Sequence, residues 1–155
     1  MKSSTAPALK GIILDANVLS LLAKENRLDL LQQYFTLPCY ITSEIYNELE
    51  VGLKNGVLYL KDVLQLIEEG HLETIAPTAA EIQFANSLPA KLGRGEAEAI
   101  AICHQQRLAF ITHDRKAANY CDQVGIVCIR LKSLLAALQN AGLLTTSEVK
   151  RILAE

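Results

Sequence analysis

Short runs that are apolar throughout alternate along the chain with segments in which apolar residues recur at helical spacing. A short, wholly apolar run is typical of a strand buried on both faces, whereas the helical spacing indicates amphipathic helices. The alternation favours βαβ units and predicts an α/β fold with a central, mostly parallel sheet of about five short strands flanked by helices. The runs that predict strands are Gly11–Leu14, Cys39–Ile41, Leu72–Ala76, Leu108–Thr112 and Gly125–Ile129.

Residues that favour helix ends set the expected limits of the helices. Two capping boxes, Thr78 with Glu81 and Thr145 with Glu148, mark helix starts. Ser43 is the expected N-cap of the helix after the second strand. The other helices are predicted over Val18–Leu22 with Leu28–Tyr34, Gly95–Gln106, Asp114–Gly125 and Leu131–Asn140.

The length of 155 residues suits one domain that can bury a sizeable core. We expect a single domain over residues 1–155, with a flexible lead-in at about residues 1–9. The C-terminal helices, within 131–155, are expected to pack on the core or on a dimer partner. A hydrophobic content of 50% and a charged content of 21% are ordinary for a soluble globular protein.

The net charge of −2 argues against binding nucleic acid through an overall positive charge, because proteins that bind in this way are usually basic. Nucleic acid would have to be held by a local patch, by metal ions or with a second subunit. The four cysteines lack CxxC spacing and no secretory signal precedes them, which favours a reduced, cytoplasmic setting. No apolar run approaches the roughly 18 residues of a membrane-spanning helix, so no membrane partner is expected.

Two aspartates follow predicted strands. Asp15 comes directly after the first strand, and Asp114 comes just after the strand that ends at Thr112. Open parallel sheets bind ligands outside the carboxyl ends of their strands, so these acids are candidates for a shared site. Each also suits a helix N-cap, although ILDANVL favours Asn17 over Asp15 as the capping residue.

Helical spacing selects further acids. Glu96 shares a helix face with Ile100 and Cys103, whereas Glu98 lies on a more polar face. A carboxylate on an apolar face is costly unless it is paired, protonated or bound to a cation, so Glu96 is favoured and Glu98 remains its rival. Glu48 lies at the border of the apolar stripe of its helix, and a solvated acidic face remains open for it.

Together these acids predict a site for divalent cations. Mg²⁺ and Mn²⁺ prefer oxygen ligands, keep several waters and are often held by only one or two carboxylates. Like charges gathered in one pocket need such cations to stay ionised. Bound ions would activate water and stabilise the negative charge of an in-line attack on phosphorus.

The ordered set of motifs resembles the PIN-domain family, over nearly the whole chain. Each motif alone is weak, whereas the ordered set is fairly specific. The GEAEAIA segment and the GLLT…VKRIL tail are similar to a prokaryotic subgroup of nucleic-acid-binding PIN proteins. The motifs are ILDANVL with Asp15, ITSEIYNEL with Glu48, GRGEAEAIAIC with Glu96, and FITHDRKA with Thr112 and Asp114.

The resemblance implies a three-layer, PIN-like (Rossmann-like) fold and Mg²⁺- or Mn²⁺-dependent endoribonuclease activity on single-stranded or structured RNA. It also implies a homodimer, and in many bacteria such domains are VapC-type toxins neutralised by a small antitoxin protein. By this resemblance Asp15, Glu48, Glu96 and Asp114 are catalytic acids, and all but Glu48 are metal ligands. Many relatives have aspartate as the third acid, so the choice between Glu96 and Glu98 stays open. The supporting or substrate-binding residues implied are Thr112, Asn17, Glu98, Arg94 and Arg115.

Other functions suit the chain less well. A non-catalytic nucleic-acid-binding or protein-interaction module with the same fold is the first alternative, and the non-basic charge favours it slightly. A haloacid-dehalogenase-like phosphatase with Asp15 as nucleophile would need a second aspartate where this chain has Asn17. A receiver domain would need a strand-end lysine, and dinucleotide binding would need a glycine-rich loop in place of DANVL.

Overall fold

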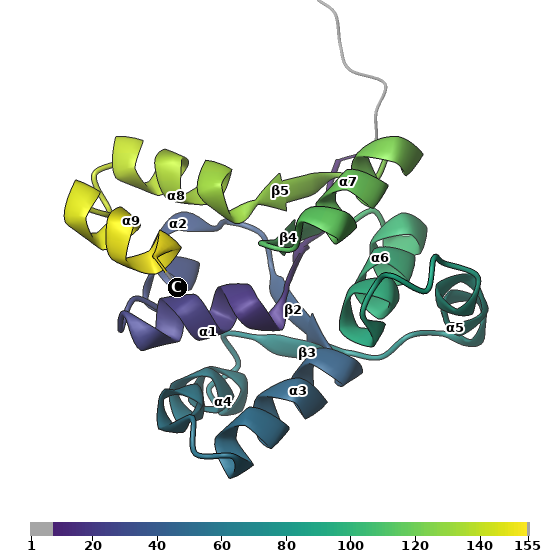
Figure 1. Cartoon of the computed structure of the whole chain (residues 1–155), viewed down its shortest axis with the longest axis horizontal. Coiled ribbons are helices and arrows are strands. Elements are labelled where there is room, and N and C mark those ends of the chain that lie inside the picture. Colours follow the sequence, from purple (N-terminus) through teal and green to yellow (C-terminus); the bar gives the residue numbers. More distant parts are fainter. Residues whose placement is uncertain (1–7, 155) are drawn as a thin grey trace, which may run out of the picture.

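A five-stranded sheet forms the centre of the structure, a computed structural model that describes residues 8–154. All strand pairs are parallel and helices flank the sheet, so the prediction of a three-layer α/β fold with a parallel sheet is confirmed (Figure 1). The part of the predicted lead-in at residues 1–7 lies outside the described residues. The strands are β1 (Ile12–Leu14), β2 (Cys39–Thr42), β3 (Glu73–Ile75), β4 (Ala109–Thr112) and β5 (Cys128–Arg130).

Helices occupy the connections between strands, and both predicted capping boxes are confirmed. Figure 1 shows α5 and α6 on one side of the central strands and α1 and α9 on the other. Across residues 8–154, no helix has the length and apolar character needed to cross a membrane. The helices are α1 (Ala16–Lys24), α2 (Leu30–Tyr34), α3 (Ser43–Lys54), the 3₁₀ helix η1 (Leu58–Leu60), α4 (Lys61–Glu68), α5 (Ala79–Asn86), α6 (Arg94–Gln106), α7 (Arg115–Val124), α8 (Leu131–Asn140) and α9 (Thr146–Leu153).

Four predicted helix starts are wrong by one or two residues, and one of them is the helix predicted from Leu28, which begins at Leu30. Thr42 and not Ser43 caps α3, because the Thr42 hydroxyl accepts a hydrogen bond from a backbone N–H at 3.1 Å. Asp15 and not Asn17 caps α1, because the Asp15 carboxylate accepts from the next backbone N–H at 2.8 Å. The helix predicted from Gly95 begins one residue earlier.

The strand order, β3-β2-β1-β4-β5, places a switch point beside β1. The chain adds β2 and β3 on one side of β1 and then returns to add β4 and β5 on the other. Ligands of open α/β sheets bind outside the carboxyl ends of the strands at such a point. Leu14 of β1 is paired with Ile111 of β4, so the residues that follow these strands emerge side by side.

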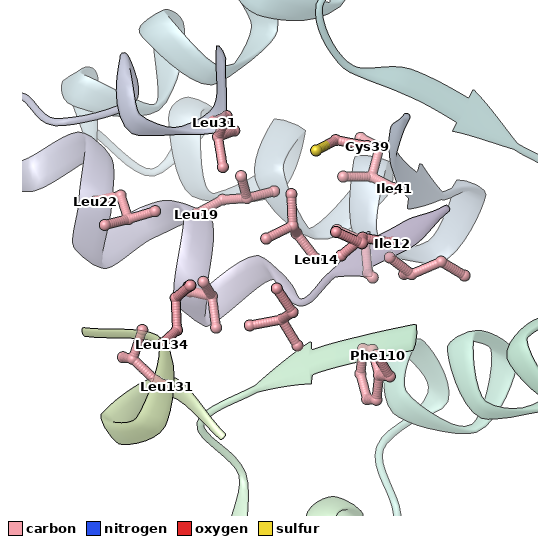
Figure 2. Close-up of a cluster of buried hydrophobic side chains, with 14 of the residues drawn as sticks. Ile12, Leu14, Leu19, Leu22, Leu31, Cys39, Ile41, Phe110, Leu131 and Leu134 are labelled. Atoms are coloured by element: carbon pink, nitrogen blue, oxygen red, sulfur yellow. The ribbon is translucent and has the colours of Figure 1, made fainter. Parts of the chain in front are cut away.

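The core packs against both central strands. Leu14 and Phe110 are fully buried, and Figure 2 shows them in one cluster with Leu19 of α1 and with Leu131 and Leu134 of α8. Burying a large apolar side chain stabilises a fold by roughly 1.5–3 kcal/mol. The strands that lead to the switch point are therefore among the most firmly held parts of the chain.

The C-terminal helices pack beside the helices that follow β1. The Arg27 guanidinium donates to Glu148 Oε2 at 2.7 Å and to the Leu143 carbonyl oxygen at 3.0 Å. Arg151 Nε also donates to Glu25 Oε1 at 2.9 Å. These contacts join α9 and the turn before it to the end of α1 within the same chain.

Candidate active site

Asp15 is a buried acid at the carboxyl end of the central strand. Its backbone N–H donates to the Ile111 carbonyl oxygen at 3.0 Å, which fixes it beside β4. Its Oδ1 accepts from the Ala16 N–H at 2.8 Å, and its Oδ2 accepts from the Thr112 hydroxyl at 2.7 Å. The residue is only 2% exposed. Both carboxylate oxygens are thus held in fixed directions at the switch point.

Glu96, in the first turn of α6, faces Asp15. Burial raises the pKa of Asp15 to about 7, and the negative charge of Glu96 and a hydrogen bond between the two carboxyl groups raise it as well. The hydrogen bonds from Thr112 and from the Ala16 N–H act in the opposite direction. Two carboxyl groups in such contact share a proton near neutral pH, or ionise together when a cation neutralises them.

Glu48 approaches the same pair from α3. Partial burial raises the pKa of Glu48, and the charges of Glu96 and Glu44 raise it further. Its Oε1 lies so close to Gly95 that a Cβ on that glycine would collide with it. Glu48 is otherwise exposed, so it stands at the solvent side of the acid pair.

The two glycines of the GRGE motif make room for carboxylates. Gly93 is the N-cap of α6, and a Cβ there would collide with Glu96 Oε1. A Cβ on Gly95 would collide with Glu48 in the same way. The sequence predicted Gly95 only as a helix start, and the room that it leaves for the Glu48 carboxylate was not predicted. The signal that could have found it is the pair of glycines directly before a candidate acid.

Glu98 lies away from the pair, at the beginning of α3. Its Oε1 accepts from the Glu44 backbone N–H at 3.0 Å and from the Ser43 hydroxyl at 3.3 Å. It therefore satisfies an N–H group at the start of another helix, which is a structural role. The geometry separates the two rival glutamates, because Glu96 lies with Asp15 and Glu98 lies with α3.

Asp114 stands at the edge of the site and caps α7. Its Oδ1 accepts from the Ala117 N–H at 3.0 Å, and its backbone N–H donates to Thr112 Oγ1 at 3.0 Å. The connection between Asp114 and Asp15 is the buried Thr112 hydroxyl, which accepts from one residue and donates to the other.

Two cavities are lined by residues predicted to belong to the site. A cavity of about 450 Å³ lies between α5, α6 and the start of α3, where Arg94 Nη2 stands 3.6 Å from Glu44 Oε2. A smaller cavity of about 160 Å³ lies beyond Thr112 and is lined in part by Arg115. Of the predicted supporting residues, Asn17 lies exposed in the first turn of α1 and lines neither cavity.

The donor chemistry of the acid pair fits a hard divalent cation. Within residues 8–154, no three His, Cys, Asp or Glu side chains are arranged to hold a metal ion by themselves. Mg²⁺ is commonly held by one or two carboxylates, with waters and substrate phosphate as its other ligands. Asp15 and Glu96 are the residues that would hold it, because a cation there removes the repulsion that raises the pKa of Asp15.

Comparisons with known proteins agree with this geometry. The family model described as PIN domain matches residues 11–155. No curated protein matches the chain.

Two solved structures resemble the chain in fold. VapBC-1 from nontypeable Haemophilus influenzae aligns with a TM-score of 0.57 and 15% identity, over 77% of this chain and 96% of that one. PAE2754 from Pyrobaculum aerophilum aligns with a TM-score of 0.53 and 17% identity, over 86% of this chain and 99% of that one. At such identities the likeness concerns the fold alone.

Proposed function

This chain belongs to the PIN-domain family, and from that premise we propose that it is a Mg²⁺- or Mn²⁺-dependent endoribonuclease that hydrolyses phosphodiester bonds of RNA. The observation that carries the proposal is the contact between the buried Asp15 and Glu96 at the switch point of the sheet. A buried carboxylate beside a second one is costly for stability, and acids with strongly perturbed pKa values are typical of functional sites.

Each residue of the site has a distinct task in this proposal. Asp15 and Glu96 would hold the cation, which would supply an activated water and neutralise charge on the phosphate. Thr112 keeps the Asp15 carboxylate in one orientation through its 2.7 Å hydrogen bond. Glu48, whose raised pKa favours proton uptake, reaches the pair from the solvent side and accepts the proton lost by the attacking water. Asp114 is connected to the pair through Thr112 and completes the acidic edge.

The experiment is cleavage of a labelled single-stranded RNA with Mg²⁺, with Mn²⁺ and with EDTA. We expect metal-dependent cleavage that falls about 100-fold or more in Glu96→Gln, the loss typical of removing transition-state charge stabilisation. Glu68→Gln, at the exposed end of α4, is the matched control and should cleave normally. Cleavage that persists in EDTA, or equal rates for the two variants, would contradict the proposal. Binding of RNA without cleavage by the wild-type protein would instead support a non-catalytic PIN module.

We also propose that the chain acts as the toxin of a toxin–antitoxin pair and forms a homodimer. Membership of the PIN family and the fold shared with VapBC-1 support a small protein partner. Expression of the chain alone should arrest growth, and co-expression with a small protein encoded by the adjacent gene should restore it. Light scattering of the purified chain measures the oligomeric state, and a monomer at micromolar concentration would contradict the homodimer.

A further inference from the structure

A basic pocket adjoins the acid pair on the β4–β5 side of the sheet. We use this name for the cavity of about 160 Å³ that is lined by Thr112 and Asp114 together with Arg115, Arg130 and Lys132. Thr112 also donates to Asp15 Oδ2, so the basic pocket and the acid pair share one residue. Three cationic side chains thus line one small cavity of a chain whose net charge is −2.

The fold brings these cations together from different elements. Arg130 ends β5 and is paired in register with Thr112 of β4. Arg115 is the first residue of α7, and Lys132 lies in the first turn of α8. Because β4 and β5 are parallel neighbours, the helices that follow them begin at the same edge of the sheet.

The cationic groups of the basic pocket keep donors available for a ligand. Within residues 8–154, the exposed side chains of Arg115 and Lys132 form no ion pair or hydrogen bond. Arg130 uses only its Nη2, which donates to Asn119 Oδ1 at 3.0 Å and to Asp122 Oδ2 at 2.8 Å. These contacts hold the guanidinium in place while its Nε and Nη1 remain open to an anion.

The first turns of α7 and α8 carry cations and no acid. The N-terminus of a helix carries partial positive charge, so a cation in the first turn is unfavourable and an acid is favourable. α3, α4, α5, α6 and α9 each have an acid in their first turn. α1, α2, α7 and α8 have none there; α7 and α8 carry Arg115 and Lys132, and the N-cap of α7 is Asp114. The start of α8, with Arg130 as its N-cap and Lys132 in its first turn, therefore carries positive charge that does not stabilise the helix.

The larger cavity, between α5, α6 and the start of α3, has the reverse character. It is lined by Glu44 and Glu98 as well as Arg94, and Arg94 lies 3.6 Å from Glu44. A phosphate there would face two carboxylates and one cation, whereas the basic pocket has three cations and one carboxylate, that of Asp114. Of these two cavities, the charges therefore favour the basic pocket for an anion.

We propose that the basic pocket binds a phosphate group of the RNA strand next to the phosphate that is cleaved, which places the strand on the β4–β5 side of the acids. Arg115, Lys132 and Arg130 donate to its non-bridging oxygens, as cations do in backbone contacts that position a nucleic acid without reading its sequence. This assignment rests on the proposed nuclease function. It adds that the RNA strand extends from the acid pair toward β5.

The test measures binding separately from cleavage. All variants are made in an Asp15→Asn background and studied in EDTA, and binding of a fluorescent single-stranded RNA is followed by anisotropy as salt is raised. Arg115→Gln with Lys132→Gln removes two charges from the basic pocket. Lys61→Gln with Lys150→Gln removes two exposed charges elsewhere, and Lys61 begins α4 as Arg115 begins α7.

We expect the dissociation constant of the pocket variant to rise about tenfold, and the slope of log affinity against log salt to decrease by about 0.7 for the phosphate contact that is lost. The control variant should stay within about twofold of its parent. Equal losses in the two double variants would show that bulk charge binds the RNA and would overturn the proposal. Absence of RNA binding by the parent would overturn it as well.

Inorganic phosphate, titrated in parallel, distinguishes a strand from a free anion. We expect it to compete with the RNA only at millimolar concentration, which would support the proposal, whereas competition as strong as that of unlabelled RNA would overturn the strand assignment. Failure of the nuclease proposal is a different result. In that case the wild-type protein shows no metal-dependent cleavage, while the pocket variant still binds RNA more weakly than the control.

Discussion

Replacing Asp15 by asparagine tests the electrostatics of the acid pair directly. In metal-free protein, burial and the charge of Glu96 raise the pKa of Asp15 from 3.8 to about 7. Between about pH 4 and pH 7 the folded state keeps a proton that the unfolded state releases, so the free energy of unfolding falls as pH rises through this window. Each pKa unit corresponds to 1.36 kcal/mol, so the whole change is at most about 4 kcal/mol.

Asparagine is neutral at every pH and avoids this loss. It can still accept the Ala16 N–H, but it no longer offers a second oxygen to the Thr112 hydroxyl. A lost hydrogen bond of this kind costs about 1 kcal/mol. We therefore expect Asp15→Asn to be slightly less stable than the wild type near pH 4 and up to about 3 kcal/mol more stable at pH 8.

The assay is urea denaturation followed by circular dichroism in EDTA at pH 5 and pH 8. The stability difference between Asp15→Asn and the wild type should grow by roughly 2–3 kcal/mol between these pH values. Asp62→Asn, an exposed acid in the first turn of α4, is the control and should show no such growth. A difference that stays constant within about 0.5 kcal/mol would refute the reasoning, because Asp15 would then ionise normally in the fold.

Three further substitutions test individual contacts of the site. Thr112→Val removes a buried hydroxyl that donates to Asp15 and accepts from Asp114. In urea denaturation it should lower the free energy of unfolding by about 1–3 kcal/mol, and it should raise the pH at which Asp15 ionises, because the lost hydrogen bond lowers the pKa of Asp15. Thr112→Ser should preserve both the stability and this pH. Gly95→Ala should change the melting temperature little, because alanine favours a helix more than glycine does. It should reduce RNA cleavage, because the added Cβ displaces the Glu48 carboxylate. Normal cleavage would show that the position of Glu48 does not matter for the reaction. Glu98→Gln should lower the melting temperature by weakening the cap on α3, and it should reduce cleavage much less than Glu96→Gln does. A larger loss of cleavage in Glu98→Gln would contradict the assignment of Glu96 to the acid pair and of Glu98 to α3.

Local patterns were sufficient to predict most of the fold. Each strand overlaps a predicted apolar run, and burial on both faces explains the run for β1, β2 and β4. The edge strands β3 and β5 are more exposed, and their limits differ from the predicted runs. The capping boxes at Thr78 and Thr145 were predictable because both of their hydrogen bonds lie within four consecutive residues. The cap of α3 was misplaced because Thr42 and Ser43 have equivalent hydroxyls, and only the backbone direction selects the first.

The arrangement of the site depends on packing that no local pattern records. Glu96 and Glu98 lie in the same turn of α6, and they differ only in what faces them across the interface with β1 and with α3. Arg130 and Lys132 were not selected because they become neighbours of Thr112 only through the pairing of β4 with β5. The catalytic and metal-binding roles of the acids remain predictions, which the substitutions above test.

The hydrogen bond between Asp15 and Thr112 joins residues that lie 97 positions apart in the chain. The central strand emerges early during synthesis, but its partner β4 follows only after three helical connections have been made. Contacts of such long separation form late, because the entropy of closing the intervening loop must be overcome first. A ribosome-bound fragment that ends before β4 therefore holds Asp15 without the hydroxyl that orients it. If the chain is a toxic nuclease, the cell that makes it is exposed to activity only from finished molecules, at the stage when a partner protein can also recognise the completed fold.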